Sequence, residues 1–239
     1  MSCCSDLPPV QAEYTPKGTY TTFSGLKTYV VGPEDAKAAV LYTYDIFGFS
    51  PQILQGADLI ASQGYRVVMP DFLVGKYATP ELFGPGAEAK KQEYISQFPA
   101  AIPTQSKPLA DSIAALKAAG HSRVAILGAC WGYKAAVITQ GLPGVDVFLA
   151  VHPTFPAPED AEKINVPALI LSTSGEDKSV IDAIEKGVEA KNPGKNFFKR
   201  YADQQHGFAA ARADLSGGDT LAAYVEAYQL IVKFLKEHL

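Results

Sequence analysis

The sequence predicts an α/β fold in which helices cover both faces of a mostly parallel central sheet. Continuous apolar runs of strand length, such as residues 38–44 and 123–127, alternate along the chain with amphipathic segments of helix length. The last of these segments, residues 219–239, carries one apolar stripe along its length. The chain has 239 residues, 47% of them hydrophobic, which is enough for a sizeable core in one domain of this class.

Local signals predict where the individual elements begin and end. Ser24-Gly25 separates two short β-rich runs, 19–23 and 26–31, and predicts a hairpin. Ser50 and Pro51 predict a helix start, and Gly64 predicts the end of that helix. The other expected strands are residues 38–44, 65–69, 123–127, 145–151, 168–172 and 196–201. The expected helices are residues 51–63, 87–98, 108–120, 133–138, 180–190 and 219–239.

The chain is expected to hold an irregular N-terminal leader, residues 1–18, and a single domain, residues 19–239. No internal repeat and no linker rich in glycine or serine divides the second part. Residues 71–102, called the excursion below, are the least regular stretch, with several prolines and one short helical segment. A stretch of this length in a compact domain is typical of a lid or a substrate-shaping segment.

Composition excludes several classes of function. A net charge of −4 leaves no basic footprint, so neither nucleic acid nor an anionic membrane surface is an expected partner. No apolar run has the length of a membrane span, and the N-terminus does not resemble a signal peptide. Three cysteines, with Cys3 and Cys4 adjacent in a polar tail, do not suggest a disulfide framework. A reduced, cytoplasmic setting is expected.

Residues 128–132, Gly128-Ala129-Cys130-Trp131-Gly132, follow a β-branched run and precede a helical stretch of small residues. Strand, glycine-flanked turn and helix form the context of a nucleophile elbow, in which the central residue is strained and exposed. A thiol at a helix N-terminus has its thiolate stabilised by backbone N–H groups. A buried structural cysteine is the alternative, but the glycines and the setting favour Cys130 as a nucleophile.

Two later strands are followed by residues that complete a catalytic triad. Their order after Cys130, an acid and then His206, is that of α/β-hydrolase triads. His206 would accept the thiol proton, and Asp177 would orient the imidazole. Glu176 is the neighbouring candidate for the acid, and the position of Asp177 in its turn favours Asp177. In an oxyanion hole, the backbone N–H groups of Trp131 and Ile46 are the expected donors.

The motifs Gly128-Ala129-Cys130-Trp131-Gly132, Asp45-Ile46-Phe47-Gly48 and His206-Gly207-Phe208, in this order and spacing, resemble the dienelactone hydrolase family. The resemblance runs from about residue 19 to the end. It implies a cofactor-free α/β-hydrolase fold, a Cys-Asp-His triad, and hydrolysis of lactones or small esters. It also implies a carboxylate at Asp45 in contact with the resting thiol, and no metal.

Two positions depart from the family pattern. Asp45 stands where bacterial members carry the longer glutamate. Arg212 lies further beyond His206 than the arginine that binds anionic substrates in those members. The residues expected to bind substrate are Asp45, Phe47, Arg212 and Lys76.

The predicted function is hydrolysis of a small-molecule lactone or carboxylic ester through a thioester acyl-enzyme, by a monomer or homodimer. One alternative is a hydrolase of a secondary-metabolite ester or thioester. Another is a non-catalytic small-molecule binding protein on the same fold. A peroxidatic role of Cys130 is the third, with Cys3 or Cys4 as the resolving thiol.

Overall fold

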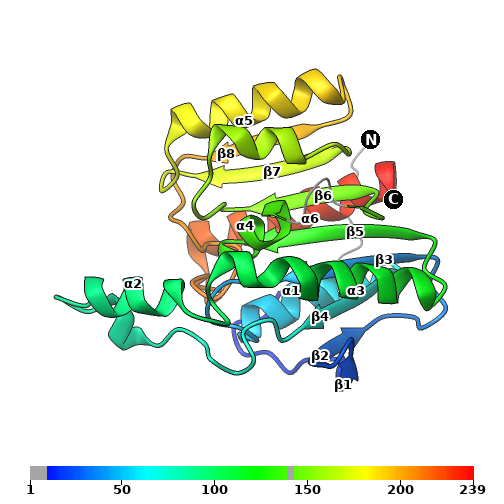
Figure 1. Ribbon diagram of the computed structural model, residues 1–239, viewed down its shortest axis with the longest axis horizontal. Coiled ribbons are helices and arrows are strands. Elements are labelled where there is room, and N and C mark those ends of the chain that lie inside the picture. Colours follow the sequence, from blue (N-terminus) through cyan, green and yellow to red (C-terminus); the bar gives the residue numbers. More distant parts are fainter. Residues whose placement is uncertain (1–9, 139–142) are drawn as a thin grey trace.

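The computed structural model describes residues 10–138 and 143–239, and within them eight strands form one sheet (Figure 1). The strand order is β1-β2-β4-β3-β5-β6-β7-β8. β1 and β2 pair with antiparallel neighbours, and all pairs from β4 to β8 are parallel. The strands are β1 (Thr19–Phe23), β2 (Leu26–Val31), β3 (Ala38–Thr43), β4 (Arg66–Pro70), β5 (Arg123–Ala129), β6 (Val147–Val151), β7 (Ala168–Thr173) and β8 (Phe197–Tyr201).

Helices cover both faces of this sheet, which confirms the predicted α/β architecture. α1 and α6 pack together on one face, and α3 and α4 pack together on the other (Figure 1). The α-helices are α1 (Pro51–Ala61), α2 (Glu88–Ser96), α3 (Ser106–Ala118), α4 (Trp131–Ile138), α5 (Lys178–Lys191) and α6 (Gly218–His238). Three short 3₁₀ helices join them: η1 (Pro80–Phe83), η2 (Ile102–Gln105) and η3 (Pro158–Lys163).

Most expected elements agree with the structure to within a few residues. The hairpin occurs with the expected bounds, and Ser50 caps α1 by accepting a hydrogen bond from the N–H of Ile53. The 3₁₀ helices were not expected, because four to six residues are too few to show a hydrophobic period. α4 begins two residues earlier than expected, directly after Cys130.

A buried carboxylate fastens the described part of the leader, residues 10–18, to the domain. Asp58 of α1 is 4% exposed and accepts hydrogen bonds from the Tyr14 hydroxyl, the Lys17 N–H and the Tyr29 hydroxyl. These residues follow an irregular path, as expected, but they are held to α1. Cys3 and Cys4 lie outside the described residues.

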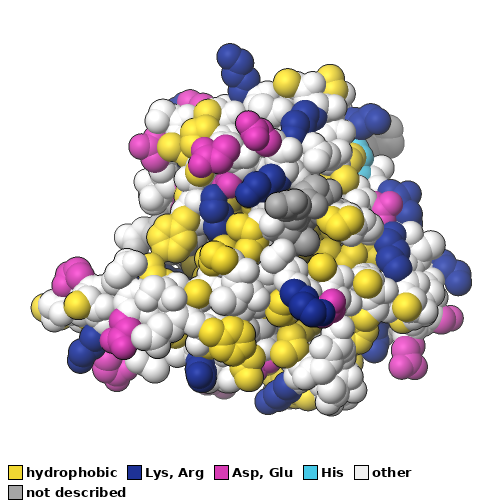
Figure 2. Space-filling view, viewed as in Figure 1, with side chains coloured by type: hydrophobic (Ala, Val, Ile, Leu, Met, Phe, Trp, Pro, Cys, Tyr) yellow, Lys and Arg dark blue, Asp and Glu magenta, His cyan; other side chains and the backbone are white. Residues whose placement is uncertain are grey.

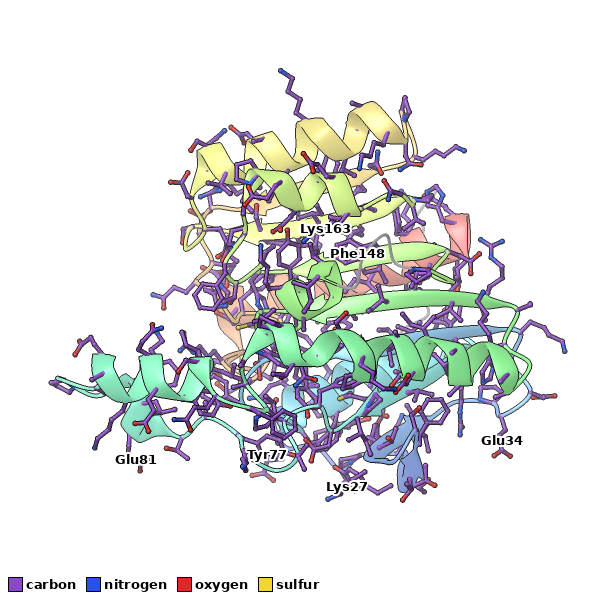
Figure 3. The ribbon with its side chains drawn as sticks, viewed as in Figure 1. Lys27, Glu34, Tyr77, Glu81, Phe148 and Lys163 are labelled. Carbon is purple, nitrogen blue, oxygen red and sulfur yellow. The ribbon has the colours of Figure 1, made fainter. Side chains whose placement is uncertain are left out.

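The excursion leaves the sheet after β4 and projects from the body as the arm that carries η1 and α2 (Figure 1). None of the side chains of α2 is buried. Figure 3 shows Glu81 on this arm and Tyr77 nearer its base, whereas Phe148 lies within the body. The arm is held at its C-terminal base, because the Trp131 indole N–H donates to the Ala100 carbonyl at 2.8 Å.

The turn between β5 and α4 requires glycine on both sides of Cys130. A Cβ atom on Gly132 would lie 2.2 Å from the carbonyl oxygen of Thr43 in β3. A Cβ atom on Gly128 would lie 2.7 Å from the backbone of Tyr133. The two glycines therefore allow α4 to pack closely against β3 and β5, which brings Cys130 to the edge of the sheet.

Among the described residues, no helix is long and apolar enough to cross a membrane.

Replacing Gly132 with alanine should destabilise the fold. The added methyl group meets backbone of a central strand, which cannot move aside as a flexible side chain would, so we expect a loss of about 3 kcal/mol. Urea unfolding followed by circular dichroism measures the loss. Gly84→Ala is the control, because φ at Gly84 is −74° and its Cβ would meet no atom closer than 3.8 Å. Equal stabilities of the two variants would contradict this account of the turn.

Candidate active site

Cys130 lies at the carboxyl edge of the sheet in a strained conformation. Its φ angle is +56°, and its side chain lies in a pocket although the residue is only 8% exposed. A positive φ in a residue with a Cβ is costly and persists where the surroundings enforce it. The strand register places the ends of β3, β5, β6, β7 and β8 at this edge, so the loops that follow them surround the thiol.

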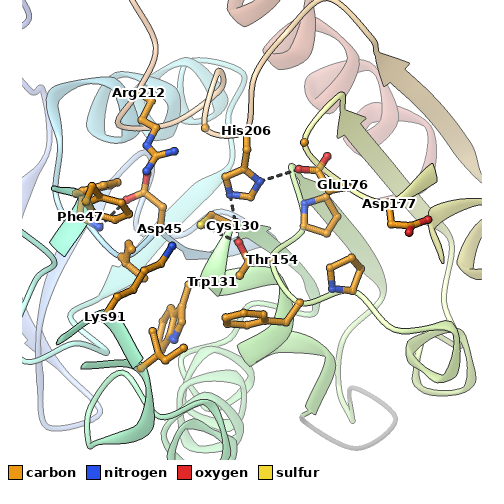
Figure 4. Close-up of a pocket in the computed structure, with 18 of the residues that line it drawn as sticks. Asp45, Phe47, Lys91, Cys130, Trp131, Thr154, Glu176, Asp177, His206 and Arg212 are labelled. Atoms are coloured by element: carbon orange, nitrogen blue, oxygen red, sulfur yellow. Dashed lines mark hydrogen bonds and ion pairs between the residues drawn. The ribbon is translucent and has the colours of Figure 1, made fainter. Parts of the chain in front are cut away.

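His206 reaches the pocket from the loop after β8 and is bonded to Glu176 from the loop after β7. The imidazole Nδ1 lies 2.7 Å from Glu176 Oε1 (Figure 4). Because a carboxylate only accepts hydrogen bonds, Nδ1 carries the proton and Nε2 faces the pocket. Burial lowers the pKa of His206, but the hydrogen bonds and charges of Cys130 and Glu176 outweigh it and raise the pKa to about 9.

Glu176 is held in place by the end of β7. Its side chain is 2% exposed, and the carboxylate accepts hydrogen bonds from the backbone N–H and the hydroxyl of Thr173. The hydroxyl of Thr173 also accepts the Gly175 N–H at 3.1 Å, which closes the turn between them. The chain therefore folds Glu176 back over the end of its own strand and directs it at His206.

The prediction that Asp177 pairs with His206 is wrong in this geometry. Asp177 is exposed and is the N-cap of α5, where its carboxylate accepts hydrogen bonds from the N–H groups of Ser179 and Val180. One carboxylate cannot hold a helix N-terminus and a histidine on the other side of the turn. The sequence carries a signal for this role, because an aspartate directly before a helix is a common N-cap.

Thr154, which the sequence analysis missed, is the residue bonded to the thiol. Its hydroxyl lies 3.1 Å from Cys130 Sγ and 3.2 Å from His206 Nε2. Asp45 was expected to contact the thiol. Both of its oxygens instead accept backbone N–H groups, Oδ1 from Phe47 at 2.9 Å and Oδ2 from Ala211 at 3.0 Å.

Asp45 nevertheless lines the pocket with Phe47 and carries a perturbed pKa. Burial raises the pKa of its carboxyl to about 6, although the two N–H groups and the nearby positive charges oppose the rise. Its observed contacts join the loop after β3 to the loop that carries Arg212. The side chain of Asp45, shorter than that of glutamate, therefore positions the backbone of these two loops.

Trp131 and Ile46, whose backbone N–H groups are the expected oxyanion donors, both line the pocket. Trp131 is the first residue of α4, where helix geometry leaves an N–H without an intrahelical acceptor. Ile46 lines the same pocket, and its carbonyl accepts the N–H of Ala78 from the excursion. Whether these two groups act as oxyanion donors remains a prediction for the proposed function below.

The pocket has a volume of about 650 Å³ and several aromatic side chains in its wall. Phe47, Phe83 and Phe155 line it, and hydrophobic side chains gather where the projecting arm meets the body (Figure 2). The guanidinium of Arg212 lies 5.6 Å from the ring centre of Phe47 and 5.0 Å from that of Phe83. Lys91 of α2 lies 5.2 Å from the Phe83 ring centre, on the same aromatic residue.

Lys76, expected as a substrate contact, is not among the residues that line this pocket. It is exposed in the turn at the base of the excursion, where its N–H donates to Leu73. Lys91 takes the position on the pocket wall instead. The sequence did not indicate that Lys91 rather than Lys76 would line the pocket, because hydrophobic periodicity does not predict the path of an irregular segment. Arg212 does reach the pocket, through tight turns after His206.

Within the described residues, no three histidine, cysteine, aspartate or glutamate side chains gather as a metal site.

Residues 26–239 match the model of the dienelactone hydrolase family. The chain belongs to the dienelactone hydrolase family. It is 34% identical to an uncharacterized AIM2 family protein of Schizosaccharomyces pombe, with 98% of each chain covered. It is 26% identical to the mouse carboxymethylenebutenolidase homolog, with 95% of this chain and 93% of that protein covered.

Solved structures agree on the fold. The dienelactone hydrolase of Anabaena variabilis superposes with a TM-score of 0.66 at 18% identity, covering 94% of this chain and 98% of that one. This dienelactone hydrolase family member therefore has the α/β-hydrolase fold that the motifs predicted. Its membership of the family supports the interpretation that it is a hydrolase.

Removing the charge of Glu176 should change the thiol, whereas removing that of Asp177 should not. The carboxylate of Glu176 favours the imidazolium, so Glu176→Gln lowers the pKa of His206 and weakens its support of a Cys130 thiolate. In a Cys3→Ser/Cys4→Ser background, iodoacetamide alkylation at pH 7 should slow about tenfold, the equivalent of one pKa unit. Asp177→Asn, which keeps a capping side chain, should alkylate at the parent rate. The opposite ranking would restore Asp177 as the acid.

Proposed function

We propose that this protein hydrolyses lactones or small carboxylic esters, with Cys130 as nucleophile, His206 as general base and acid, and Glu176 as the acid that orients His206. The observation that carries the proposal is the hydrogen-bonded chain from Glu176 to Nδ1 of His206, beside a cysteine held at φ +56°. Family membership supports the reaction class.

The reaction begins when the Cys130 thiolate attacks the ester carbonyl. Negative charge then develops on the carbonyl oxygen, where the N–H groups of Trp131 and Ile46 stabilise it. His206 gives its Nε2 proton to the departing alcohol, and a thioester remains on Cys130. Water attacks this thioester while His206 accepts its proton, and the carboxylic acid leaves as the Cys130 thiolate and the protonated His206 are restored.

The size and lining of the pocket favour a small substrate with a flat or apolar body and an anionic group. Phe47, Phe83 and Phe155 offer aromatic walls. Arg212 and Lys91 put two positive charges on the same pocket, within about a Debye length of each other through their shared contact with Phe83. In a lactone the leaving alkoxide stays attached to the acyl group, so one pocket holds the substrate throughout.

Replacing Cys130 with alanine should abolish turnover. Only binding and oxyanion stabilisation survive without the nucleophile, so kcat/KM for the best ester should fall by roughly three or more orders of magnitude. A screen of lactones, aryl esters and thioesters on the wild type identifies that substrate. Cys3→Ser/Cys4→Ser is the matched control and should retain full activity. Near wild-type hydrolysis by Cys130→Ala would refute the nucleophile assignment.

Arg212 should discriminate substrates that carry a free carboxylate. A charge-assisted hydrogen bond contributes about 1.5–3 kcal/mol, so Arg212→Gln should raise KM about tenfold to a hundredfold for a carboxylate-bearing ester. The matched neutral ester should be affected far less. Lys76→Gln removes a lysine outside the pocket and should leave both substrates unchanged. Equal effects of Arg212→Gln on the charged and neutral esters would exclude an anion-binding role.

A further inference from the structure

The hydroxyl of Thr154 is within hydrogen-bond distance of both atoms between which the proposed reaction moves a proton. Oγ1 lies 3.1 Å from Cys130 Sγ and 3.2 Å from His206 Nε2 (Figure 4). A hydroxyl has one donor and two acceptor sites. It can therefore accept from one of these neighbours while it donates to the other, and then reverse both roles.

The loop after β6 is built to hold this hydroxyl at the thiol. The Cys130 N–H donates to the Val151 carbonyl at 3.1 Å, and the Thr154 N–H donates to the Cys130 carbonyl at 3.2 Å. The backbone takes positive φ values at two residues with a Cβ, 39° at His152 between these anchors and 51° at Phe155 directly after Thr154. Strain of this kind is found where the surroundings fix one functional geometry.

A buried carboxylate holds the far end of the same loop. Asp160 of η3 is 1% exposed and accepts hydrogen bonds from the Tyr133 hydroxyl at 2.9 Å, Lys134 Nζ at 2.6 Å and the Ala157 N–H at 3.0 Å. Tyr133 and Lys134 belong to α4, the helix that starts directly after Cys130. Both ends of the loop are thus bonded to Cys130 or to the helix that follows it. These bonds fix the position of Thr154 relative to Cys130.

The groups around Cys130 and His206 leave Nε2 as the imidazole nitrogen that faces Thr154. Glu176 occupies Nδ1 from the loop after β7. His152 packs edge-on at 5.0 Å between ring centres, and neither of its ring nitrogens has a hydrogen-bond partner among the described residues. Burial, and then the charge of His206, hold the pKa of His152 well below its usual value, so this second imidazole stays neutral.

The remaining titratable groups approach the pocket from four other elements. Asp45 follows β3, Arg212 follows β8, Glu88 and Lys91 lie on α2, and Asp177 caps α5. Asp45 is bonded to the backbone of Phe47 and Ala211, and Arg212 and Lys91 stack on aromatic rings. In the part of the chain that the structure describes, Thr154 is therefore within hydrogen-bond distance of both Sγ and Nε2, which also lie close enough for Cys130 to raise the pKa of His206 directly.

We propose that Thr154 is a catalytic residue that transfers the proton between Cys130 and His206, an inference that rests on the proposed function. In the neutral pair the thiol donates to Oγ1, and the hydroxyl donates to Nε2. The S–H bond breaks as its proton moves to Oγ1, and the original hydroxyl proton moves to Nε2. Thr154 ends unchanged, with its hydroxyl now donating to the thiolate and accepting from the imidazolium.

Alkylation of Cys130 tests this role without any ester. In a Cys3→Ser/Cys4→Ser background, the rate of reaction with iodoacetamide is measured from pH 5 to pH 10 for the parent, Thr154→Val and Thr154→Ser. Valine has the shape of threonine without the hydroxyl, so the thiolate loses a hydrogen-bond donor. We expect the midpoint of the profile to rise by about one pH unit and the rate at pH 7 to fall about tenfold. Thr154→Ser keeps a hydroxyl and should stay within about twofold of the parent.

Thr154→Ala is a second variant without the hydroxyl, and it should give the same shift as valine if valine disturbs folding. A Thr154→Val or Thr154→Ala profile that superimposes on the parent would overturn the proposal. An equal loss in Thr154→Ser would overturn it as well, because packing rather than the hydroxyl would then matter.

The same variants separate this inference from the proposed function. If the alkylation profile depends on the hydroxyl as expected but the parent hydrolyses no lactone, ester or thioester, the hydrolase proposal fails and the proton transfer through Thr154 is supported. If the parent hydrolyses esters and Thr154→Val keeps its full kcat/KM across the pH range, the Thr154 proposal fails alone.

Discussion

The site depends on how closely α4 approaches the central strands. The carbonyl of Thr43 occupies the space that a side chain at Gly132 would need, and the backbone of Tyr133 occupies the space that one at Gly128 would need. This approach forces the single residue at the top of the turn, Cys130, into a positive φ angle. Every other group of the site is then placed relative to that residue, because the loops after the neighbouring strands bond to its backbone or to each other.

Much of this arrangement could be predicted from sequence, because strand-turn-helix periodicity and glycine spacing are local signals. They predicted the fold, and they predicted Cys130, His206, Trp131 and Ile46 as residues that the structure brings to one pocket. The choice between Glu176 and Asp177 was not local in the same way. It depends on which side chain the turn directs at His206. In the structure Asp177 is bonded to the N-terminus of α5 and is therefore not directed at His206. Thr154 and Lys91 were missed because irregular loops carry no period, and their positions depend on tertiary bonds.

Glu176, and not the expected Asp177, is bonded to His206, and this changes how the site is supported. Glu176 is bonded to the hydroxyl and N–H of Thr173, so its orientation depends on the last residue of a central strand. Asp177 stabilises α5 from the same turn. Two adjacent carboxylates thus have separate hydrogen-bond partners, Glu176 with His206 and Asp177 with the N-terminus of α5.

The indole of Trp131 holds the C-terminal end of the projecting arm at a point outside η1 and α2. One bond from that indole to the Ala100 carbonyl holds the end of the excursion, while no side chain of α2 is fully buried and Tyr94 packs against the core only in part. The bonds at the two ends of the arm, Trp131 to Ala100 and Ala78 to Ile46, involve no residue of η1 or α2. In evolutionary terms, selection can vary η1 and α2 while the sheet and the turn at Cys130 are inherited.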